Sequence, residues 1–343
     1  MKKILAAILT LTLILGLFAC SGGSDEPAGS DGEAKAMEIT IATPHPNNEK
    51  DPVYIYCKTF ADLVTEKTEG RITFDIQGDS VLGDDVEIAE GLTLGTLDMG
   101  ITSNAAISGY DPAHQLYALP FLFDDDEQAN AFIDSDIAAE MNQGLESKGM
   151  KVMSILDGGF RQSLNTKKTI KAMADFKGMK WRVPPMDLFT DTFNALGANA
   201  TPMGGAEVFT GLQQGTIDGC EFPVSSIYSM QLYTAAKYID MTNHMFAAWY
   251  MCTSDDLWNK LSAEEQEIFS EAAKAANEAS RKAQMESVES QLAEIEKAGA
   301  VVNRDVNTEE MRKAVQPILD SYRDKIGAEL YDKAMDYVDS LRK

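Results

Sequence analysis

Two twelve-residue segments of this chain repeat one another without a gap, and this repeat constrains the fold more than any other feature. Residues 87–98 (EIAEGLTLGTLD) and 207–218 (EVFTGLQQGTID) share six identical positions of twelve, and two more positions exchange one aliphatic residue for another. Each segment predicts a helix, a glycine turn and the start of a strand. Any helix-to-strand turn attracts glycine and aspartate, but six identities in register favour two similar lobes. A protein with two α/β lobes has its natural ligand cleft between them.

The segments before the first repeat predict the order strand, helix, strand. Residues 38–43 alternate polar and apolar side chains, residues 53–64 carry apolar residues at helical spacing, and residues 71–76 alternate again. This order is the signature of a mostly parallel sheet. We therefore predict an α/β fold of two lobes, each a mixed, mostly parallel sheet flanked by helices.

A long helix is predicted near the C-terminus. Ser262 and Glu265 form a capping-box sequence, and the helical pattern continues to about Lys297. Roughly 35 residues at the standard rise span about 50 Å, which is too long for one lobe. The alanine-rich stripe of this segment lacks the apolar heptads of a coiled coil. We predict a helix that lies along both lobes.

Three other segments carry predictions that bear on the site. Residues 117–123 are an apolar run broken by proline, which favours a strand between the domains or at a domain edge. Residues 127–148 predict one helix. Residues 152–156 predict a buried strand that opens, at residues 157–162, into a segment where two glycines let the backbone approach a neighbour closely.

The N-terminal residues are typical of a bacterial lipoprotein signal peptide. Two lysines precede an apolar run from residue 4 to residue 19, and Leu-Phe-Ala-Cys ends at Cys20. The run is short of a bilayer span, which disfavours a transmembrane anchor. We expect residues 1–19 to be removed and Cys20 to be lipidated. Residues 20–37 would then tether the protein flexibly to the cell membrane, outside the cytoplasm.

The two predicted lobes are each built from separate parts of the sequence. Lobe I is expected to take residues 38–158 and about 247–286. Lobe II is expected to take residues 159–246 and about 287–343. The chain therefore passes between the lobes more than once.

Charge and cysteine content exclude several classes of function. The chain has 30 basic and 54 acidic residues, a net charge of −24, which disfavours nucleic acid as a partner. Beyond Cys20 only Cys57, Cys220 and Cys252 remain, without a CxxC pair, so we expect buried thiols with room for one disulfide. The three histidines are scattered along the chain. We therefore predict no metal site and no cofactor.

Arg182 stands in an unusual place for a charge. It follows the apolar Trp181 and precedes Val183, and because Val183 comes before proline it is pushed toward an extended conformation. Arg182 is therefore expected at a strand end, where α/β proteins bind ligands. A guanidinium matches a carboxylate with two parallel hydrogen bonds. Arg161, at another predicted strand end, gives a second basic group, and the pair favours an external anion over a structural ion pair.

No catalytic motif accompanies these arginines. The sequence contains no GxSxG, no HExxH, no GxxxxGK[ST] and no GxGxxG after a strand. The acid pair Asp84-Asp85 and the acidic residues 124–126 are interpreted as helix caps and solvated surface. We therefore predict a binding protein and not an enzyme.

The ordered motifs from about residue 39 to the C-terminus resemble the solute-binding proteins of TRAP transporters, the DctP-like family. The motifs are residues 158–162 with Asn165, 176–184 (FKGMKWRVP), 200–207, 212–223 and 241–244. The resemblance implies a periplasmic-binding-protein-like fold whose lobes close on a ligand and are joined by crossing strands and a long helix. It also implies that Arg182 clamps a carboxylate, that Arg161 supports it, and that the small and large membrane subunits of the transporter are partners.

Departures from the family pattern bear on the ligand. Sialic-acid-binding members look as though they carry an acid at Ser103, an asparagine at Phe222 and an aromatic residue near Gly204 and Gly205. The loss of polar partners argues against a polyhydroxylated sugar acid. Phe222 and Trp249 suggest an apolar wall, so we expect a monocarboxylate with an apolar or aromatic body. The alternative is that Phe222 only packs in the hinge.

The expected ligand-binding residues are those at predicted strand ends and turns facing the cleft: Arg182, Arg161, Phe222, Trp249, Ser103, Asn104, Glu221, Gly205 and His45. Within the same family, a C4-dicarboxylate or a sugar acid is the alternative ligand. Outside it, the alternatives are an ABC-type binding protein and a surface hydrolase or ligand-sensing surface protein. A neighbouring gene for an ATPase, in place of the two membrane subunits, would favour the ABC type.

Overall fold

The computed structural model describes residues 36–342. The predicted signal peptide, Cys20 and most of the predicted linker lie outside the described residues. Within residues 36–342, no helix combines the length and apolar character needed to cross a membrane.

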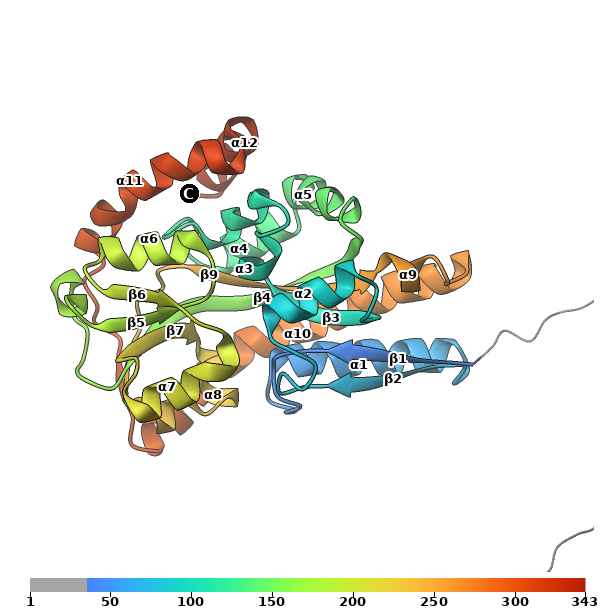
Figure 1. The fold of residues 1–343 in the computed structure, drawn as a ribbon, viewed down its shortest axis with the longest axis horizontal. Helices are drawn as coiled ribbons and strands as arrows, with labels where there is room; N and C mark the ends of the chain where they lie inside the picture. Colours follow the sequence, from blue (N-terminus) through green and yellow to red (C-terminus); the bar gives the residue numbers. More distant parts are fainter. Residues whose placement is uncertain (1–35, 343) are drawn as a thin grey trace, which may run out of the picture. The chain divides into compact units, whose positions relative to one another are not determined.

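The described residues form one mixed sheet of ten strands (Figure 1). The strands are β1 (Met37–Ala42), β2 (Ile72–Gln77), β3 (Met99–Ser103), β4 (Met150–Asn165), β5 (Lys180–Val183), β6 (Asn199–Pro202), β7 (Gly219–Pro223), β8 (Tyr238–Asp240), β9 (Phe246–Ser254) and β10 (Val301–Asn303).

Two parallel groups of strands are joined by long antiparallel strands. The sheet order is β2-β1-β3-β9-β4-β7-β5-β6, while β8 pairs with β4 and β10 pairs with β8. Strands β2, β1 and β3 are parallel, as are β7, β5 and β6. Strand β9 runs antiparallel to both β3 and β4, and β4 runs antiparallel to β7. The predicted α/β fold of two mixed, mostly parallel lobes is confirmed.

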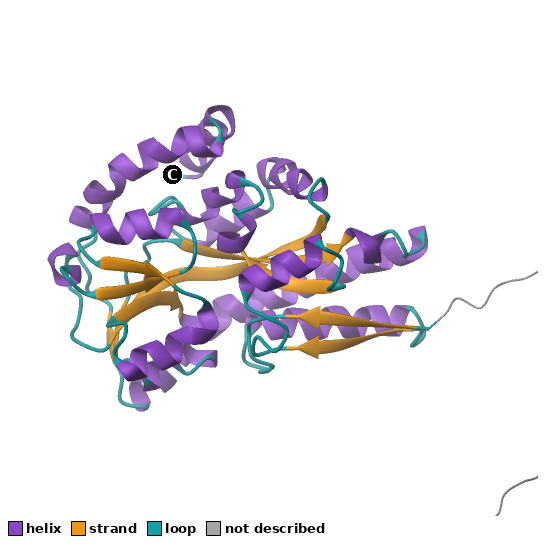
Figure 2. Ribbon diagram, viewed as in Figure 1, coloured by secondary structure: helices purple, strands orange, loops and turns teal. Residues whose placement is uncertain are grey.

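Helices cover both faces of the sheet (Figure 2). The α-helices are α1 (Pro52–Lys67), α2 (Asp85–Thr93), α3 (Asn104–Ile107), α4 (Asp126–Ile133), α5 (Asp136–Glu146), α6 (Asp187–Ala195), α7 (Val208–Gln214), α8 (Val224–Ser229), α9 (Asp255–Trp258), α10 (Ala263–Lys297), α11 (Glu309–Ile326) and α12 (Ala328–Leu341). The 3₁₀ helices are η1 (Pro112–Ala118), η2 (Met173–Phe176), η3 (Gly205–Glu207) and η4 (Leu232–Thr234).

The sequence repeat corresponds to two equivalent turns. Helix α2 leads through Gly95, at φ 66°, to β3, and helix α7 leads through Gly215, at φ 71°, to β7. Both glycines adopt the left-handed conformation, which favours glycine at this position. In each turn the next two backbone N–H groups donate to one helix carbonyl, that of Gly91 in the first turn and Gly211 in the second.

Strand β4 passes from one group of strands to the other. It pairs with β9 as far as Phe160 and with β7 from Arg161 onward, and its register shifts between Asp157 and Phe160. A Cβ on Gly158 would lie 2.6 Å from the carbonyl oxygen of Ala247 on β9. The prediction that this strand ends before the glycines was therefore wrong. The glycines form a bulge that lets the strand continue across the molecule.

Two element predictions were wrong because local caps were missed. Residues 117–123 are not a strand: most of this region follows η1, which Asp111 caps by accepting a hydrogen bond from the backbone, and Pro120 has no N–H for a strand ladder. The predicted helix over residues 127–148 is two helices, α4 and α5. They separate where Ser135 caps α5.

Helix α10 spans 35 residues and begins at the predicted capping box of Ser262 and Glu265. Phe269, near its start, packs in the core formed with α1, β1 and β3. Ile295, near its end, packs in the core formed with β7, α7 and α8. The prediction of a long helix along both lobes is confirmed.

Candidate ligand-binding site

Arg161 on β4 and Glu221 on the neighbouring β7 form a buried ion pair. The Arg161 Nε donates to Glu221 Oε2, and its Nη2 donates to Oε1 and to the backbone carbonyl oxygen of Glu221, both at 3.0 Å. Arg161 is 4% exposed and Glu221 is 0% exposed. The charge of Arg161 is therefore largely neutralised within the protein.

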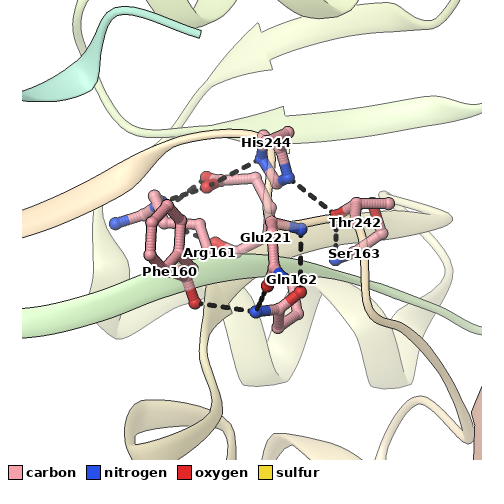
Figure 3. A network of polar contacts seen from close by, with 8 residues as sticks. Phe160, Arg161, Gln162, Ser163, Glu221, Thr242 and His244 are labelled. Carbon is pink, nitrogen blue, oxygen red and sulfur yellow. Dashed lines mark hydrogen bonds and ion pairs between the residues drawn. The ribbon is translucent and has the colours of Figure 1, made fainter. Parts of the chain in front are cut away.

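A chain of polar contacts extends from this pair (Figure 3). The Nε2 of His244 lies 3.7 Å from Glu221 Oε2, and its Nδ1 lies 2.8 Å from the Thr242 hydroxyl. The backbone N–H of Ser163 donates to that same hydroxyl at 3.2 Å. His244 therefore lies near the same carboxylate oxygen of Glu221 that accepts from Arg161 Nε.

Contacts in this network keep Glu221 ionised. Burial raises the pKa of the Glu221 carboxyl, but the charge of Arg161 and the polar contacts of Arg161 and His244 outweigh burial, and the net pKa lies below the ordinary value. Burial lowers the pKa of His244, although Glu221 opposes this. The imidazole is therefore neutral near pH 7 and the Arg161–Glu221 pair is the charged unit.

Arg182, on β5, is buried but has no acidic hydrogen-bond partner among the described residues. It is 2% exposed, its Nε donates to the carbonyl oxygen of Met203 at 2.9 Å, and its buried Nη1 has no partner. Burial lowers its pKa, and the charge of Glu221 opposes this. Arg182 is thus a buried guanidinium with a donor free for an anion.

Phe222, on β7, lies against both arginines. Its ring centroid is 5.0 Å from Arg182 Cζ and 5.4 Å from Arg161 Cζ. Phe189 on α6, which the sequence interpretation missed, lies 5.1 Å from Arg161 Cζ. The aromatic faces attract the two guanidiniums and help to hold them close to one another.

Trp249, Ser103 and His45 come together in the other group of strands. Trp249 on β9 pairs in register with Ser103 on β3, and its ring meets that of His45 edge-on at a centroid distance of 4.5 Å. The Nδ1 of His45 lies 3.3 Å from Asp51 Oδ2. The Ser103 hydroxyl caps α3, while the next residue, Asn104, has a buried Nδ2 without a partner among the described residues.

The glycines after Met203 differ in their surroundings. A Cβ on Gly205 would meet nothing within 4 Å, whereas a Cβ on Gly204 would lie 2.6 Å from Asp84 Oδ2. Gly205 therefore borders open space beside the residue whose carbonyl binds Arg182. Gly204 lies against the start of α2, which belongs to the other group of strands and helices.

Asp85 is a further polar residue of this region that the sequence interpretation missed. Asp84 caps α2 as predicted, by accepting from two backbone N–H groups. Asp85 instead has a buried Oδ1 without a partner among the described residues. Burial raises its pKa to about 6, and His45, Arg182 and Arg161 oppose that rise by charge.

The repeat contained a signal for Asp85. Extended two residues toward the N-terminus, the alignment of residues 87–98 with 207–218 places Asp85 opposite Gly205, which was an expected site residue. Its neighbour Asp84 lies against Gly204, which follows Met203, the residue whose carbonyl accepts from Arg182. Asp85 therefore lies one residue from a contact between the two sets of expected site residues.

Cysteines and metal-binding groups add nothing to the site. Cys57, Cys220 and Cys252 are buried and unbridged. Within residues 36–342, no cluster of three histidine, cysteine, aspartate or glutamate side chains could hold a metal ion.

Comparison with known proteins identifies close relatives. The family model "Bacterial extracellular solute-binding protein, family 7" (DctP) matches residues 44–325. The 2,3-diketo-L-gulonate-binding periplasmic protein YiaO of Escherichia coli (strain K12) is 30% identical over 260 residues, which cover 76% of this chain and 79% of that protein.

Solved structures of other proteins share the fold of this chain over nearly all of its described residues. The sugar acid binding protein DctPAm from Advenella mimigardefordensis strain DPN7T, in complex with galactonate, superposes with a TM-score of 0.86 at 27% identity and covers 90% of this chain and 99% of its own. A TRAP periplasmic solute-binding protein from Polaromonas sp. JS666, bound to D-erythronate, gives a TM-score of 0.84 at 30% identity. The match covers 87% of this chain and 98% of that protein.

Proposed function

This chain belongs to family 7 of the bacterial extracellular solute-binding proteins, and on that premise we propose that it captures an organic acid at Arg182 by closure of its two lobes. The bound acid is then delivered to the small and large membrane subunits of a TRAP transporter. The role is binding and transfer, without chemical conversion of the ligand. The observation that carries the proposal is the buried Arg182 guanidinium with an unpaired Nη1.

A carboxylate is the ligand group that Arg182 fits. Its fork of donors matches the two oxygens of a carboxylate, and one donor is already fixed on the Met203 carbonyl. Arg161 does not compete, because Glu221 holds it. Exclusion of water on closure strengthens the attraction between Arg182 and the bound carboxylate.

We place the hinge where the long strands change partners. Strand β4 changes from β9 to β7 at the bulge between Asp157 and Phe160, beside the predicted lobe boundary at residues 158 and 159. Strand β9 returns beside it from Phe246. Lobe I would then hold residues 38–158 and about 247–286, and lobe II residues 159–246 and about 287–343.

A hydroxylated acid fits the polar atoms of the site. The buried Asp85 Oδ1 and Asn104 Nδ2 have no partner among the described residues, and a ligand hydroxyl group, which can both donate and accept, would satisfy either atom. The two solved relatives bind galactonate and D-erythronate, which are hydroxylated monocarboxylates. We therefore favour a hydroxylated monocarboxylate.

An acid with an apolar body, the ligand expected from the sequence, is the second candidate. It is favoured by the open space beside Gly205 and by the rings of Phe222 and Trp249. However, the Phe222 ring also packs on the two arginines and the Trp249 ring on His45. Both rings therefore have partners within the protein.

Lipid anchoring through Cys20 is part of the proposal. The apolar run, the Leu-Phe-Ala-Cys sequence and the Ser- and Gly-rich residues after it support cleavage before Cys20 and attachment to the membrane. Labelled palmitate should enter the wild-type protein and not the Cys20→Ser variant. Equal labelling of both would rule out this anchor.

A thermal-shift screen followed by titration calorimetry tests the ligand. The panel contains galactonate, D-erythronate, phenylacetate, 2-oxobutyrate and succinate, and we expect the largest rise in melting temperature with a hydroxylated monocarboxylate. A rise in melting temperature with phenylacetate alone would favour the apolar candidate. A rise with succinate alone would favour a C4-dicarboxylate. If none of a broad set of organic acids changes the melting temperature, the result would contradict the proposed function.

A further inference from the structure

We propose that Asp85 takes up a proton when an organic acid binds at Arg182, so that capture of the ligand is coupled to protonation of this one residue. The inference rests on the proposed function. Its tests are chosen so that it can fail while carboxylate binding at Arg182 stands.

The buried charges near Arg182 balance one another before a ligand binds. Arg161 and Glu221 neutralise one another through two side-chain hydrogen bonds. Arg182 has no acidic hydrogen-bond partner among the described residues, and Asp85, whose Oδ1 is buried without a partner, is a further negative group that acts on it. A ligand carboxylate brings a second negative charge to the same arginine. An excess negative charge away from water is costly, and a proton on Asp85 removes it.

Asp85 is held in place by its neighbours and lies among charged groups. Its position at the first turn of α2 is fixed by Asp84, which caps the helix, and by Thr102, whose hydroxyl donates to the Asp85 carbonyl oxygen at 2.6 Å. The titratable and charged groups near it, on its own helix and on the elements that face it, are His45, Asp84, Glu87, Arg161 and Arg182. Thr102 on the neighbouring β3 is uncharged.

A carboxylate bound at Arg182 raises the pKa of Asp85. Burial raises the pKa of Asp85 to about 6, with His45, Arg182 and Arg161 opposing that rise. A carboxylate bound to Arg182 offsets the positive charge that Asp85 feels, so the pKa of Asp85 rises further. At pH 7 the free protein then holds Asp85 mainly as a carboxylate, and the complex holds it as a carboxylic acid.

The proton balance is simple. One proton passes from the solvent buffer to Oδ1 of Asp85, no bond of the ligand changes, and the ligand remains a carboxylate. The new O–H can donate a hydrogen bond to a ligand oxygen, which an ionised Asp85 cannot do. Release of the acid returns the proton to solvent.

Calorimetry measures the proton directly. The probe is the acid of the panel that raises the melting temperature most, titrated at pH 7 in phosphate and in Tris, which differ widely in ionisation enthalpy. We expect uptake approaching one proton per ligand bound. Above pH 6 the affinity should fall, by up to about tenfold per pH unit, until the pKa of the complex is passed.

Two matched variants assign the proton to a residue. Asp85→Asn places a neutral amide of the same shape at this position, and it should abolish proton uptake and make the affinity independent of pH. Asp126→Asn is the control. Burial and the charges of Asp157 and Asp125 also raise the pKa of Asp126 to about 6, but this residue lies on helix α4 and is not one of the site residues. The control should keep the uptake and pH dependence of the wild type.

The outcomes separate the two proposals. A wild-type protein that binds the acid with no proton uptake and a flat pH profile overturns this inference and leaves the proposed function intact. Uptake that persists in Asp85→Asn overturns the assignment to Asp85. If an Arg182→Ala variant binds the acid as tightly as the wild type, that result contradicts the proposed function itself.

Discussion

Arg161 and Glu221 neutralise one another inside the protein, with Arg161 Nη2 3.0 Å from Glu221 Oε1 and neither residue more than 4% exposed. Arg182 lies on the same Phe222 ring as Arg161 but hydrogen-bonds a backbone carbonyl instead of an acid. We therefore propose different roles for the two arginines: Arg161 as a structural charge, and Arg182 as the group that binds an external anion.

Replacement of Glu221 by glutamine should destabilise the folded protein strongly. Arg161 would keep its buried charge without a counter-ion, and the removal of one partner of a buried pair costs about 3–5 kcal/mol. Guanidinium unfolding without ligand measures this change in the free energy of unfolding. Glu271→Gln is the control, because Glu271 is 57% exposed in its pair with Lys67, and such surface pairs contribute about 0–1 kcal/mol. Equal losses in both variants would contradict the assigned role of Arg161.

Gly219→Ala should also destabilise the protein, because the space for its Cβ is already filled. A Cβ there would lie 2.3 Å from Trp181 Cζ3 and 2.8 Å from the carbonyl oxygen of Leu164. Overpacking of this kind costs about 1–3 kcal/mol. Gly205→Ala, where no atom lies within 4 Å, should change the free energy of unfolding by less than about 0.5 kcal/mol. A tolerated Gly219→Ala would show that β5 and β7 pack differently.

Asp126 should make stability depend on pH. Burial and two neighbouring carboxylates raise its pKa to about 6, above the value of about 3.9 in an unfolded chain. Because the folded pKa is raised, the stability linked to Asp126 is present below about pH 4 and lost as the pH rises through about 6. Asp126→Asn should therefore stabilise the protein at pH 7.5 by about 1 kcal/mol, after allowance for partial exposure, and have little effect at pH 4. An equal effect at both pH values in chemical unfolding would contradict the raised pKa.

Features set by local sequence were predictable. The capping box at Ser262 located the start of α10, the proline after Val183 located the end of β5, and the repeated glycine turns located two equivalent helix-to-strand connections. In each case neighbouring residues determine the backbone conformation directly. The place of Arg182 near the end of β5 was predictable for the same reason.

Features that depend on contacts between distant segments were not predictable. Glu221 pairs with Arg161, 60 residues earlier, because β4 and β7 are neighbours in the sheet, and no local sequence signal marks this pair. Asp84 and Asp85 look alike in sequence, and only the folded chain shows that the first caps α2 while the second turns a carboxylate oxygen into the interior. The bulge that carries β4 across the molecule likewise depends on its closeness to β9.

The central claim is that the buried Arg182 guanidinium binds the carboxylate of the ligand, and calorimetric titration of Arg182→Ala tests it most directly. The control is Arg304→Ala, which removes a half-exposed arginine paired with Glu296. We predict that Arg304→Ala binds the best acid of the panel like the wild type, while Arg182→Ala loses about 2–5 kcal/mol of binding free energy. An unchanged affinity in a folded Arg182→Ala protein would contradict the account.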